Sequence, residues 1–293
     1  MSTERIQNLD ISACDSQRTR RVFDCCLFNG EMDVFSIRLH ELSDVVDYFI
    51  IVESDRTFSG IPRDISFHLG DPRIAEFATK IRHVVVTDMP ETDDPWTREK
   101  WQRNAVLRGA PDAAQTDLLV LSDVDEIPRG KVVAQMAKDL EHEAFGARMA
   151  FSYFYVNYRN VVGPESARIW AVAATRRQLD NILPDDLRHA VRDGRAGARI
   201  FDDAGWHFSY LTDKVGIQRK LAAFSHQEYN NATFLDSIDI ERTVREGRDL
   251  FGRPGYCWEL VPNPDLPEWL QQNRWPMRHL FCPPGDPAPP VGP

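Results

Sequence analysis

The stretch from Asp117 to Pro128, DLLVLSDVDEIP, places an unbroken apolar run directly before three acidic residues. Residues 118–121 show no alternation with polar side chains, which predicts a strand buried on both faces, as in a parallel sheet covered by helices. Asp123, Asp125 and Glu126 stand where that strand should end. Ligands of open α/β sheets bind just outside the carboxyl ends of the strands. The sequence therefore predicts a functional site at this point.

The acidic pair suggests a cation site. If the backbone stays extended, Asp123 and Asp125 point to the same side, and Pro128 is expected to stop the ladder. Two close carboxylates need a cation to remain charged, and oxygen ligands suit Mg²⁺ or Mn²⁺, which usually also holds substrate phosphates. The alternative is a turn in which each Asp bonds its local backbone, because a lone D-x-D motif is weakly specific.

The first 130 residues alternate between strand and helix patterns. Apolar strands are predicted at 22–28, 45–52 and 81–86, and helices at 31–42, 72–80 and 96–107. This alternation predicts a parallel sheet with right-handed crossovers. The second half is mixed: we expect strands at 147–158 and 169–174, an aromatic segment at 199–210, and helices at 131–140, 184–191, 215–224 and 239–247.

We expect three regions in the chain. Residues 1–20 carry few apolar side chains and are interpreted as a loose arm. Residues 21–260 form a single α/β domain. In residues 261–293, ten of 33 positions are Pro, a composition that should not make a packed core, so this tail is expected to wrap around the domain or to be disordered.

Composition narrows the partners and the location. A net charge of −10 argues against nucleic acid, which requires a basic face. The sequence has no apolar run of membrane-span length and begins with a polar stretch unlike a secretory signal. Five Cys, an odd number without C-x-x-C spacing, suit a reducing compartment. We expect a cytoplasmic protein without a transmembrane segment, and peripheral membrane association is the alternative.

Several segments together resemble glycosyltransferase family 17. In chain order they are FNGEMDVFSIRLHELSDVVDYFIIVES, DPWTREKWQRNAVLRG, DVDEIP, GWHFSY and KLAAFSHQE, and they run from about Phe28 to Phe251. The resemblance implies a GT-A type fold, a nucleotide-sugar donor, divalent-metal dependence and inversion at the anomeric carbon. It leads us to expect transfer of a sugar, N-acetylglucosamine, from a UDP-sugar to the hydroxyl of a glycan acceptor.

The resemblance assigns roles around the acidic motif. Asp125 is expected to be the direct ligand of Mn²⁺ or Mg²⁺, with Asp123 acting through the ribose or a metal-bound water and Glu126 orienting both. His207 lies between Trp206 and Phe208. It is either a packed core residue or a ligand of the metal or diphosphate, since imidazole suits Mn²⁺.

Five further residues are candidates for binding the nucleotide. Glu53 and Ser54 end a predicted strand where a GT-A fold meets the base and ribose, and the alternative is simple capping of that strand. Arg98, Arg103 and Asn104 lie on the helix before the central strand. The planar guanidinium suits a diphosphate, but a charged helix face is often only solvated, so we expect one of the two arginines to act.

Inverting transfer also requires a carboxylate base within reach of the acceptor hydroxyl. The candidates are Glu228, which has no capping role, and Asp185 and Asp186, for which the alternative is a helix cap. The aromatic side chains of Tyr153 and Trp170 could stack on sugar rings or simply belong to the core.

Two other classes of function remain open. A nucleotidyltransferase or phosphohydrolase could use the same acids, but the sequence has no G-x-x-x-x-G-K loop. A non-catalytic glycan-binding module on the same fold is the other alternative, and the acids and His207 argue against it.

Overall fold

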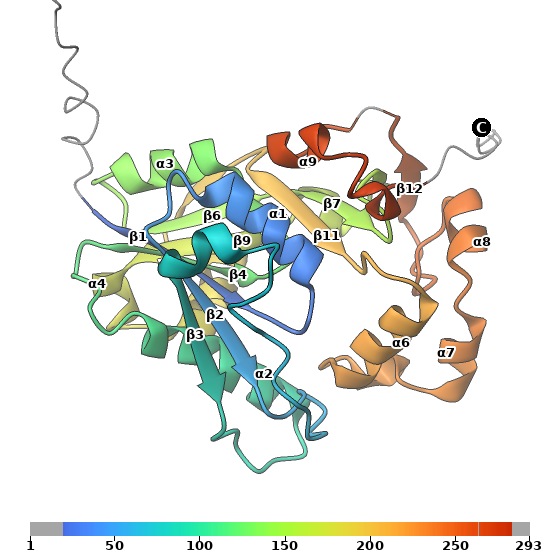
Figure 1. Cartoon of the computed structure of the whole chain (residues 1–293), viewed down its shortest axis with the longest axis horizontal. Helices are drawn as coiled ribbons and strands as arrows, with labels where there is room; N and C mark the ends of the chain where they lie inside the picture. The colour runs from blue at the N-terminus through green and yellow to red at the C-terminus, as the bar shows by residue number, and fades with distance from the viewer. Residues whose placement is uncertain (1–19, 263, 283–293) are drawn as a thin grey trace, which may run out of the picture.

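A seven-stranded sheet forms the centre of the protein (Figure 1). The computed structural model describes residues 20–262 and 264–282. The strand order is β10-β6-β9-β4-β1-β2-β3. The block β3-β2-β1-β4 is parallel, β9 runs antiparallel to both β4 and β6, and β10 is parallel to β6. The strands are β1 (Val22–Leu27), β2 (Tyr48–Ser54), β3 (Ile81–Val86), β4 (Leu118–Asp123), β6 (Ala144–Arg148), β9 (Ile169–Thr175) and β10 (Arg199–Phe201).

Helices cover both faces of this sheet. The α-helices are α1 (Met32–Leu42), α2 (Pro95–Asn104), α3 (Gly130–Lys138), α4 (Arg176–Leu179), α5 (Pro184–Arg192), α6 (Lys214–Ala223), α7 (Ala232–Ser237), α8 (Ile240–Arg245) and α9 (Glu268–Gln272). Short 3₁₀ helices are η2 (Ala75–Lys80), η3 (Ala105–Gly109), η4 (Pro164–Ala167), η5 (Gln227–Tyr229) and η6 (Arg278–Leu280). The segment expected as a helix at 72–80 is thus the 3₁₀ helix η2.

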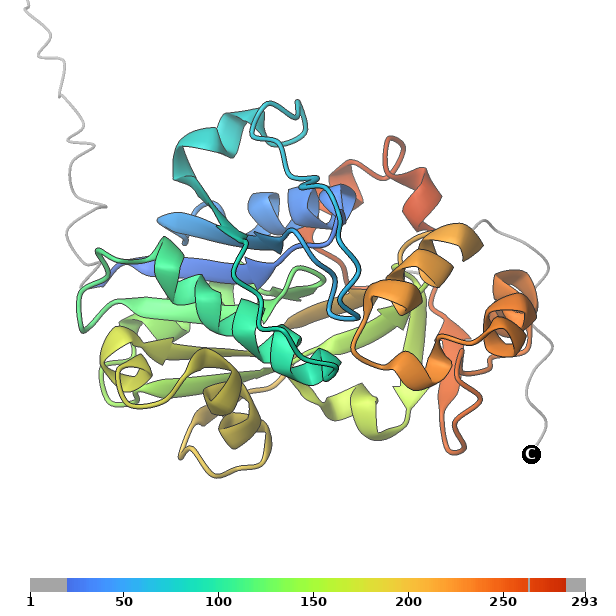
Figure 2. The same cartoon turned by 90° about the horizontal axis from the view of Figure 1, so that it is seen from below.

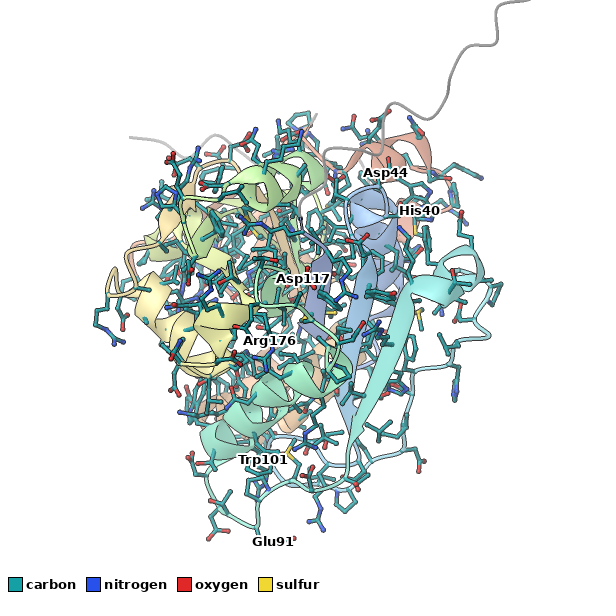
Figure 3. The ribbon with its side chains drawn as sticks, turned by 90° about the vertical axis from the view of Figure 1, so that its left-hand side faces the viewer. His40, Asp44, Glu91, Trp101, Asp117 and Arg176 are labelled. Atoms are coloured by element: carbon teal, nitrogen blue, oxygen red, sulfur yellow. The ribbon has the colours of Figure 1, made fainter. Side chains whose placement is uncertain are left out.

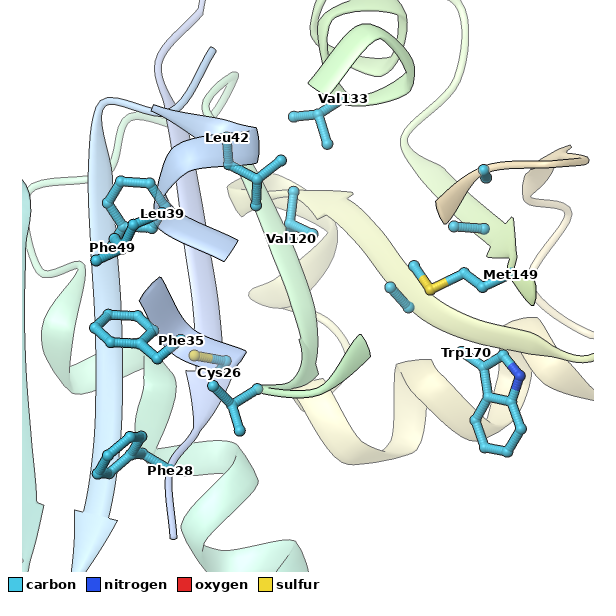
Figure 4. Packing of buried hydrophobic residues seen from close by; sticks show 14 of the residues in the cluster. Cys26, Phe28, Phe35, Leu39, Leu42, Phe49, Val120, Val133, Met149 and Trp170 are labelled. Carbon is cyan, nitrogen blue, oxygen red and sulfur yellow. The ribbon is translucent and has the colours of Figure 1, made fainter. Parts of the chain in front are cut away.

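Side chains of the central sheet point alternately to its two faces and belong to two hydrophobic clusters, one on each face. Val120 of β4 joins α1 and α3 on one face, whereas Leu119 and Leu121 join η3, α4 and α5 on the other. Figure 4 shows Phe35 and Leu39 of α1 beside Phe49 of β2. The predicted burial of residues 118–121 on both faces is confirmed, and so is the mixed α/β fold with a mostly parallel sheet.

A second sheet, ordered β12-β8-β7-β11-β5, extends the fold beyond the central one. It contains β5 (Glu126–Pro128), β7 (Ala150–Tyr153), β8 (Tyr158–Val162), β11 (Gly205–Ser209) and β12 (Cys257–Leu260). The expectation of one strand over 147–158 is wrong, because Phe154 has φ 61° and turns the chain between β7 and β8. The ladder ends at Pro128, as expected: Pro128 is the last residue of β5 and pairs with Gly205, which an edge strand permits.

The Pro-rich tail packs where the structure describes it. Leu270 of α9 and the neighbouring Leu266 and Phe281 are buried against Ile37 and Trp206. Of the two expected alternatives, residues 264–282 follow wrapping around the domain. The expectation that they add nothing to a packed core is wrong, because apolar side chains spaced between the prolines reach α1 and β11. Residues 283–293 and the arm at 1–19 lie outside the described residues.

The carboxyl ends of the parallel strands share one edge. In Figure 3, Asp44, which precedes β2, and Glu91, which follows β3, lie at opposite ends of the molecule. The last residues of β1 and β4 are paired, Leu27 with Asp123. The sequence-predicted acids therefore lie at the carboxyl edge, and α2 and α6 lie on the same side of the molecule (Figure 2).

Candidate active site

A cavity of about 650 Å³ opens at the carboxyl edge of the central sheet. Asp123, Asp125 and Glu126 all line it, as the sequence predicted. Its other walls come from α2, α5, β11, α6 and the segments around residues 56–58, 165–170 and 251–253. Ligand-sized cavities of this kind with convergent polar groups are the usual place for a binding site.

Arginines from two helices hold Asp123. The Oδ1 atom accepts a hydrogen bond from Arg103 Nη2 of α2 at 3.0 Å, and Oδ2 accepts one from Arg188 Nη2 of α5 at 3.1 Å. Burial opposes ionisation of Asp123, but Arg188 and Arg103 outweigh it and hold its pKa well below the usual range. This carboxylate is therefore charged and already compensated by protein cations.

Asp125 faces a different set of partners. Its Oδ2 accepts a hydrogen bond from Lys220 Nζ at 2.9 Å, and its Oδ1 lies 3.5 Å from His207 Nε2. Burial again opposes ionisation, but Lys220 and His207 hold the pKa of Asp125 below its usual range. His207 packs between the rings of Phe151 and Trp170, at centroid distances of 4.7 Å and 4.1 Å. The structure thus brings together Asp125 and His207, which are 82 positions apart in the sequence.

Glu126 is buried and ties the acidic turn to α5. Its Oε2 accepts hydrogen bonds from the backbone N of Asp123 at 2.9 Å and from Arg188 Nη1 at 2.8 Å. This geometry agrees with the predicted orienting role.

Arg38 supports the same turn from behind. It forms a fully buried ion pair with Asp24 at 2.5 Å and donates to the carbonyl oxygens of Asp123 and Glu126 at 3.2 Å and 2.8 Å. Because a turn at the end of a buried strand leaves carbonyl groups unpaired, this arginine satisfies groups that would otherwise be costly to bury.

Asp125 and His207 fit a divalent cation that is shared with a ligand. Among the residues that the structure describes, no three His, Cys, Asp or Glu side chains form a group that could hold a metal ion. Mg²⁺ and related ions are, however, often held by only one or two protein groups together with substrate phosphates. The Asp125 Oδ1 and His207 Nε2 atoms form such an oxygen and nitrogen pair, whereas Asp123 is held by two arginines. The metal stays a prediction, with Asp125 and His207 as its residues.

The nucleotide-binding candidates on α2 divide into two groups. Arg103 lines the cavity and bonds Asp123, Glu99 and Asp185. Arg98 lies outside the cavity lining and donates to the backbone oxygens of Phe58 and Thr92. Asn104 accepts a hydrogen bond from the backbone N of Asp185. Of the two arginines only Arg103 lines the cavity, so it stays the predicted nucleotide contact, whereas the bonds of Arg98 and Asn104 are structural.

The structure does not support Glu53 and Ser54 as nucleotide contacts. Both are fully buried and neither lines the cavity. Glu53 accepts hydrogen bonds from Ser66 N at 2.8 Å and Phe67 N at 3.0 Å, and Ser54 Oγ donates to Val86 O at 3.0 Å. The structural alternative holds because Ser66 and Phe67, in the chain that folds back over the end of β2, bond the Glu53 side chain. The Ser54 side chain is instead bonded by Val86 of β3 and the backbone N of Arg56.

The structure also does not favour the three residues predicted as the catalytic base. Glu228 and Asp186 are 59% and 46% exposed, bond His226 and Lys100 respectively, and do not line the cavity. Asp185 lines the cavity, but its Oδ1 accepts a hydrogen bond from Arg103 Nη1 at 2.7 Å. Both aspartates lie in the first turn of α5, after Pro184, where acidic side chains favour the helix dipole. Neither caps the helix, because its N-cap position is Leu183 and carries no side-chain hydrogen bond, so the capping alternative is wrong.

Sequence reasoning missed Arg188 and Lys220. Arg188 and Arg192 are four residues apart on α5, a spacing that places both on one helix face. Lys220 begins the KLAAFSHQE segment. The arginine spacing and the lysine were visible in the sequence, but neither indicated which acidic side chains these residues would contact.

The fold and the site together define an α/β protein whose ligand site, lined by acids and cations, lies at the carboxyl edge of its sheet. The chain belongs to glycosyltransferase family 17, whose family model matches residues 10–255. The sheet is mostly parallel and mixed only at one side, which is the α/β architecture that the sequence predicted.

The curated relatives that this chain matches share the same protein name. The β-1,4-mannosyl-glycoprotein 4-β-N-acetylglucosaminyltransferase of Rattus norvegicus is 26% identical over 294 residues, covering 89% of this chain and 54% of the rat protein. The Homo sapiens protein of that name is 26% identical over 236 residues, covering 72% of this chain and 44% of its own length. The chain therefore spans about half the length of the curated relatives it matches.

Among solved structures, glucosyl-3-phosphoglycerate synthase from Mycobacterium tuberculosis aligns with 13% identity and a TM-score of 0.40, covering 86% of this chain and 91% of that one. A TM-score this low carries no argument about function. No helix among residues 20–262 and 264–282 has the length and apolar character needed to cross a membrane.

Proposed function

We propose that this chain is a metal-dependent, inverting glycosyltransferase that moves N-acetylglucosamine from a UDP-sugar to a glycan hydroxyl. The observation that carries the proposal is the setting of Asp125, which faces the cavity with Lys220 and His207 against its two carboxylate oxygens. The names of the curated relatives suggest the donor sugar and the class of acceptor.

The charge around the cavity suits a nucleoside diphosphate leaving group. Asp125 and His207 would hold a divalent cation, which as a Lewis acid supplies neutralisation of the departing diphosphate. Arg103, Arg188 and Lys220 lie on the same wall, where they are paired with Asp123 and Asp125. Guanidinium groups bond phosphate oxygens in pairs, and preorganised charges of this kind stabilise developing negative charge.

The other part of the cavity wall is aromatic and suits the base and sugar rings of a nucleotide-sugar. Trp96, Trp170, Tyr229 and Phe251 line the cavity with aromatic surface. Aromatic faces combine a large apolar area with an orienting quadrupole, which favours the planar base and the apolar faces of sugars. Phosphate-binding and ring-binding surfaces therefore meet in one cavity, as a nucleotide-sugar requires.

A thermal-shift panel of nucleotide-sugars, with and without Mn²⁺, tests donor and metal together, because a ligand that binds only the native state raises the apparent stability. We expect a Mn²⁺-dependent rise of the melting temperature with UDP-N-acetylglucosamine and none with Asp125→Asn. If another UDP-sugar raised the melting temperature instead, that sugar would be the donor. No rise with any nucleotide-sugar would contradict the proposal.

UDP release distinguishes transfer from phosphate hydrolysis. A transferase releases UDP in proportion to added glycan acceptor, and the new linkage has inverted stereochemistry by NMR. Steady release of inorganic phosphate without acceptor would instead support a phosphohydrolase. A matched exposed variant, Asp202→Asn, should leave UDP release unchanged, since that side chain is 78% exposed and bonds only Arg148 among the described partners.

A further inference from the structure

Glu165 presents an unpaired oxygen to the cavity. The residue is 8% exposed and lines the cavity. It lies in the four-residue 3₁₀ helix η4, between β8 and β9. Its Oε1 accepts a hydrogen bond from Arg253 Nη1 at 3.1 Å. Its Oε2 is buried and has no hydrogen-bond partner among the described residues. An unsatisfied buried acceptor is costly, so this oxygen calls for a donor.

A second unpaired atom lies on the same wall. The indole Nε1 of Trp170 is buried without a hydrogen-bond partner, and Trp170, 9% exposed, lines the cavity five residues after Glu165. Trp Nε1 can only donate, and a charged carboxylate oxygen can only accept. A hydroxyl group does both, so a bound hydroxyl can pair with either atom. A sugar hydroxyl has this chemistry.

Glu165 also stands at a suitable place relative to the acids. Contacts lead from Asp125 to His207 at 3.5 Å, from His207 to the Trp170 ring at 4.1 Å, and from that ring to Arg168 at 5.1 Å. Arg168 lies 4.0 Å from Glu165. Glu165 and the cation-binding residues therefore line one cavity without touching each other, and an inverting reaction needs its base and its leaving group apart, with the anomeric carbon between them.

The other buried carboxylates of the cavity are occupied. Glu99 bonds Arg103 through Oε1 and Ser225 through Oε2. Arg253, by contrast, is held mainly by Asp249, through Nε at 3.0 Å and Nη2 at 2.8 Å, and reaches Glu165 with one nitrogen. This arrangement fixes the Glu165 carboxylate, which the Tyr256 hydroxyl also approaches, and leaves Oε2 without a hydrogen bond from Arg253.

We propose that Glu165 is the catalytic base that binds the acceptor hydroxyl, an inference that rests on the proposed glycosyl transfer. The hydroxyl proton passes to Glu165 Oε2 while the acceptor oxygen forms its bond to the anomeric carbon of the donor. The bond from that carbon to the diphosphate oxygen breaks, and its electron pair leaves with the nucleoside diphosphate. Glu165 then returns the proton to solvent.

The test uses Glu165→Gln in the full chain, with UDP-N-acetylglucosamine and a panel of glycan acceptors. We expect transfer to fall by about 100-fold or more, the usual contribution of a general base. Donor affinity, measured by calorimetry, should stay within about twofold, because only a base and not a donor contact is removed. The melting temperature should change little, since Arg253 keeps Asp249. Glu259→Gln, an exposed change on β12, is the matched control.

A second variant separates a base from a structural residue. Glu165→Ala should regain part of its transfer rate with added formate or azide, which a merely structural carboxylate would not allow. Transfer by Glu165→Gln above about a tenth of the wild-type rate would overturn the assignment, as would a hundredfold loss in Glu228→Gln with Glu165→Gln active. If the wild-type chain transfers sugar to no acceptor, the proposed function itself fails and the role of Glu165 falls with it.

Discussion

The Lys220 ammonium lies 2.9 Å from Asp125 Oδ2, and both side chains are largely withdrawn from solvent. Lys220 also lies 3.4 Å from Glu31, and Asp125 and Glu31 hold the pKa of the lysine above its usual range against the effect of burial. A protein cation therefore already compensates the carboxylate that is expected to bind a divalent ion.

Lys220→Met should destabilise the protein, because it leaves the Asp125 carboxylate buried beside His207 alone. Loss of one partner of a buried ion pair typically costs about 3–5 kcal/mol. Mn²⁺ should recover part of that loss, since a metal ion replaces the missing charge. Urea denaturation with and without Mn²⁺ measures both effects. Arg219→Met, an exposed change on the same helix, is the control, and equal Mn²⁺ responses in both variants would contradict the expectation.

Arg103→Lys should weaken nucleotide-sugar binding by about tenfold or more, because a lysine cannot reproduce a fork that contacts Asp123, Glu99 and Asp185. Arg98→Lys should instead lower the melting temperature, since its guanidinium joins the backbone at Phe58 to that at Thr92. Calorimetric titration and thermal unfolding of both variants separate binding from stability. A loss of affinity in Arg98→Lys equal to that in Arg103→Lys would show that the two roles are not distinct.

Glu53 should give stability a specific dependence on pH. Burial opposes its ionisation, but hydrogen bonds from His83, Ser66 and Phe67 lower its pKa from 4.5 to about 2. Because the folded-state pKa is depressed, the contribution is fully present above pH 4.5 and is lost as the pH falls toward 2. The shift corresponds to a contribution of order 3 kcal/mol.

Glu53→Gln isolates that contribution. The difference in unfolding free energy between wild type and Glu53→Gln should be largest near neutral pH and should shrink as the pH falls through 4.5. Urea titrations at a series of pH values measure it. A difference that does not vary with pH would mean that the Glu53 carboxylate titrates alike in the folded and unfolded chains.

The packed part of the Pro-rich tail should contribute to stability. Leu270→Ala removes a fully buried side chain and should cost about 2–5 kcal/mol. Trp275→Ala, in the same tail but 77% exposed, should cost less than about 0.5 kcal/mol. Chemical denaturation compares the two. Equal small effects would mean that this segment adds nothing to the core.

The acidic site was predictable from a local pattern, whereas its partners were not. Asp125 and Glu126 follow their own strand, so their place at the carboxyl edge follows from residues 118–128. The interpretation of Glu53 as a nucleotide contact rested on the same logic, yet the chain at 62–67 folds over that strand end. Whether a strand-end carboxylate faces a cavity or a loop depends on residues far along the chain.

By itself, the amino-acid sequence determined the alternation of buried strands and helices, the mostly parallel sheet and the position of the acidic turn, because periodicity and turn residues act over a few neighbours. Tertiary structure alone decided that Lys220 and His207 meet Asp125, that Arg188 meets Asp123, and that Glu165 keeps one oxygen unpaired. These pairings join segments from α5, α6, β11 and η4, and only the packing of those segments around one cavity brings their charges within hydrogen-bond distance.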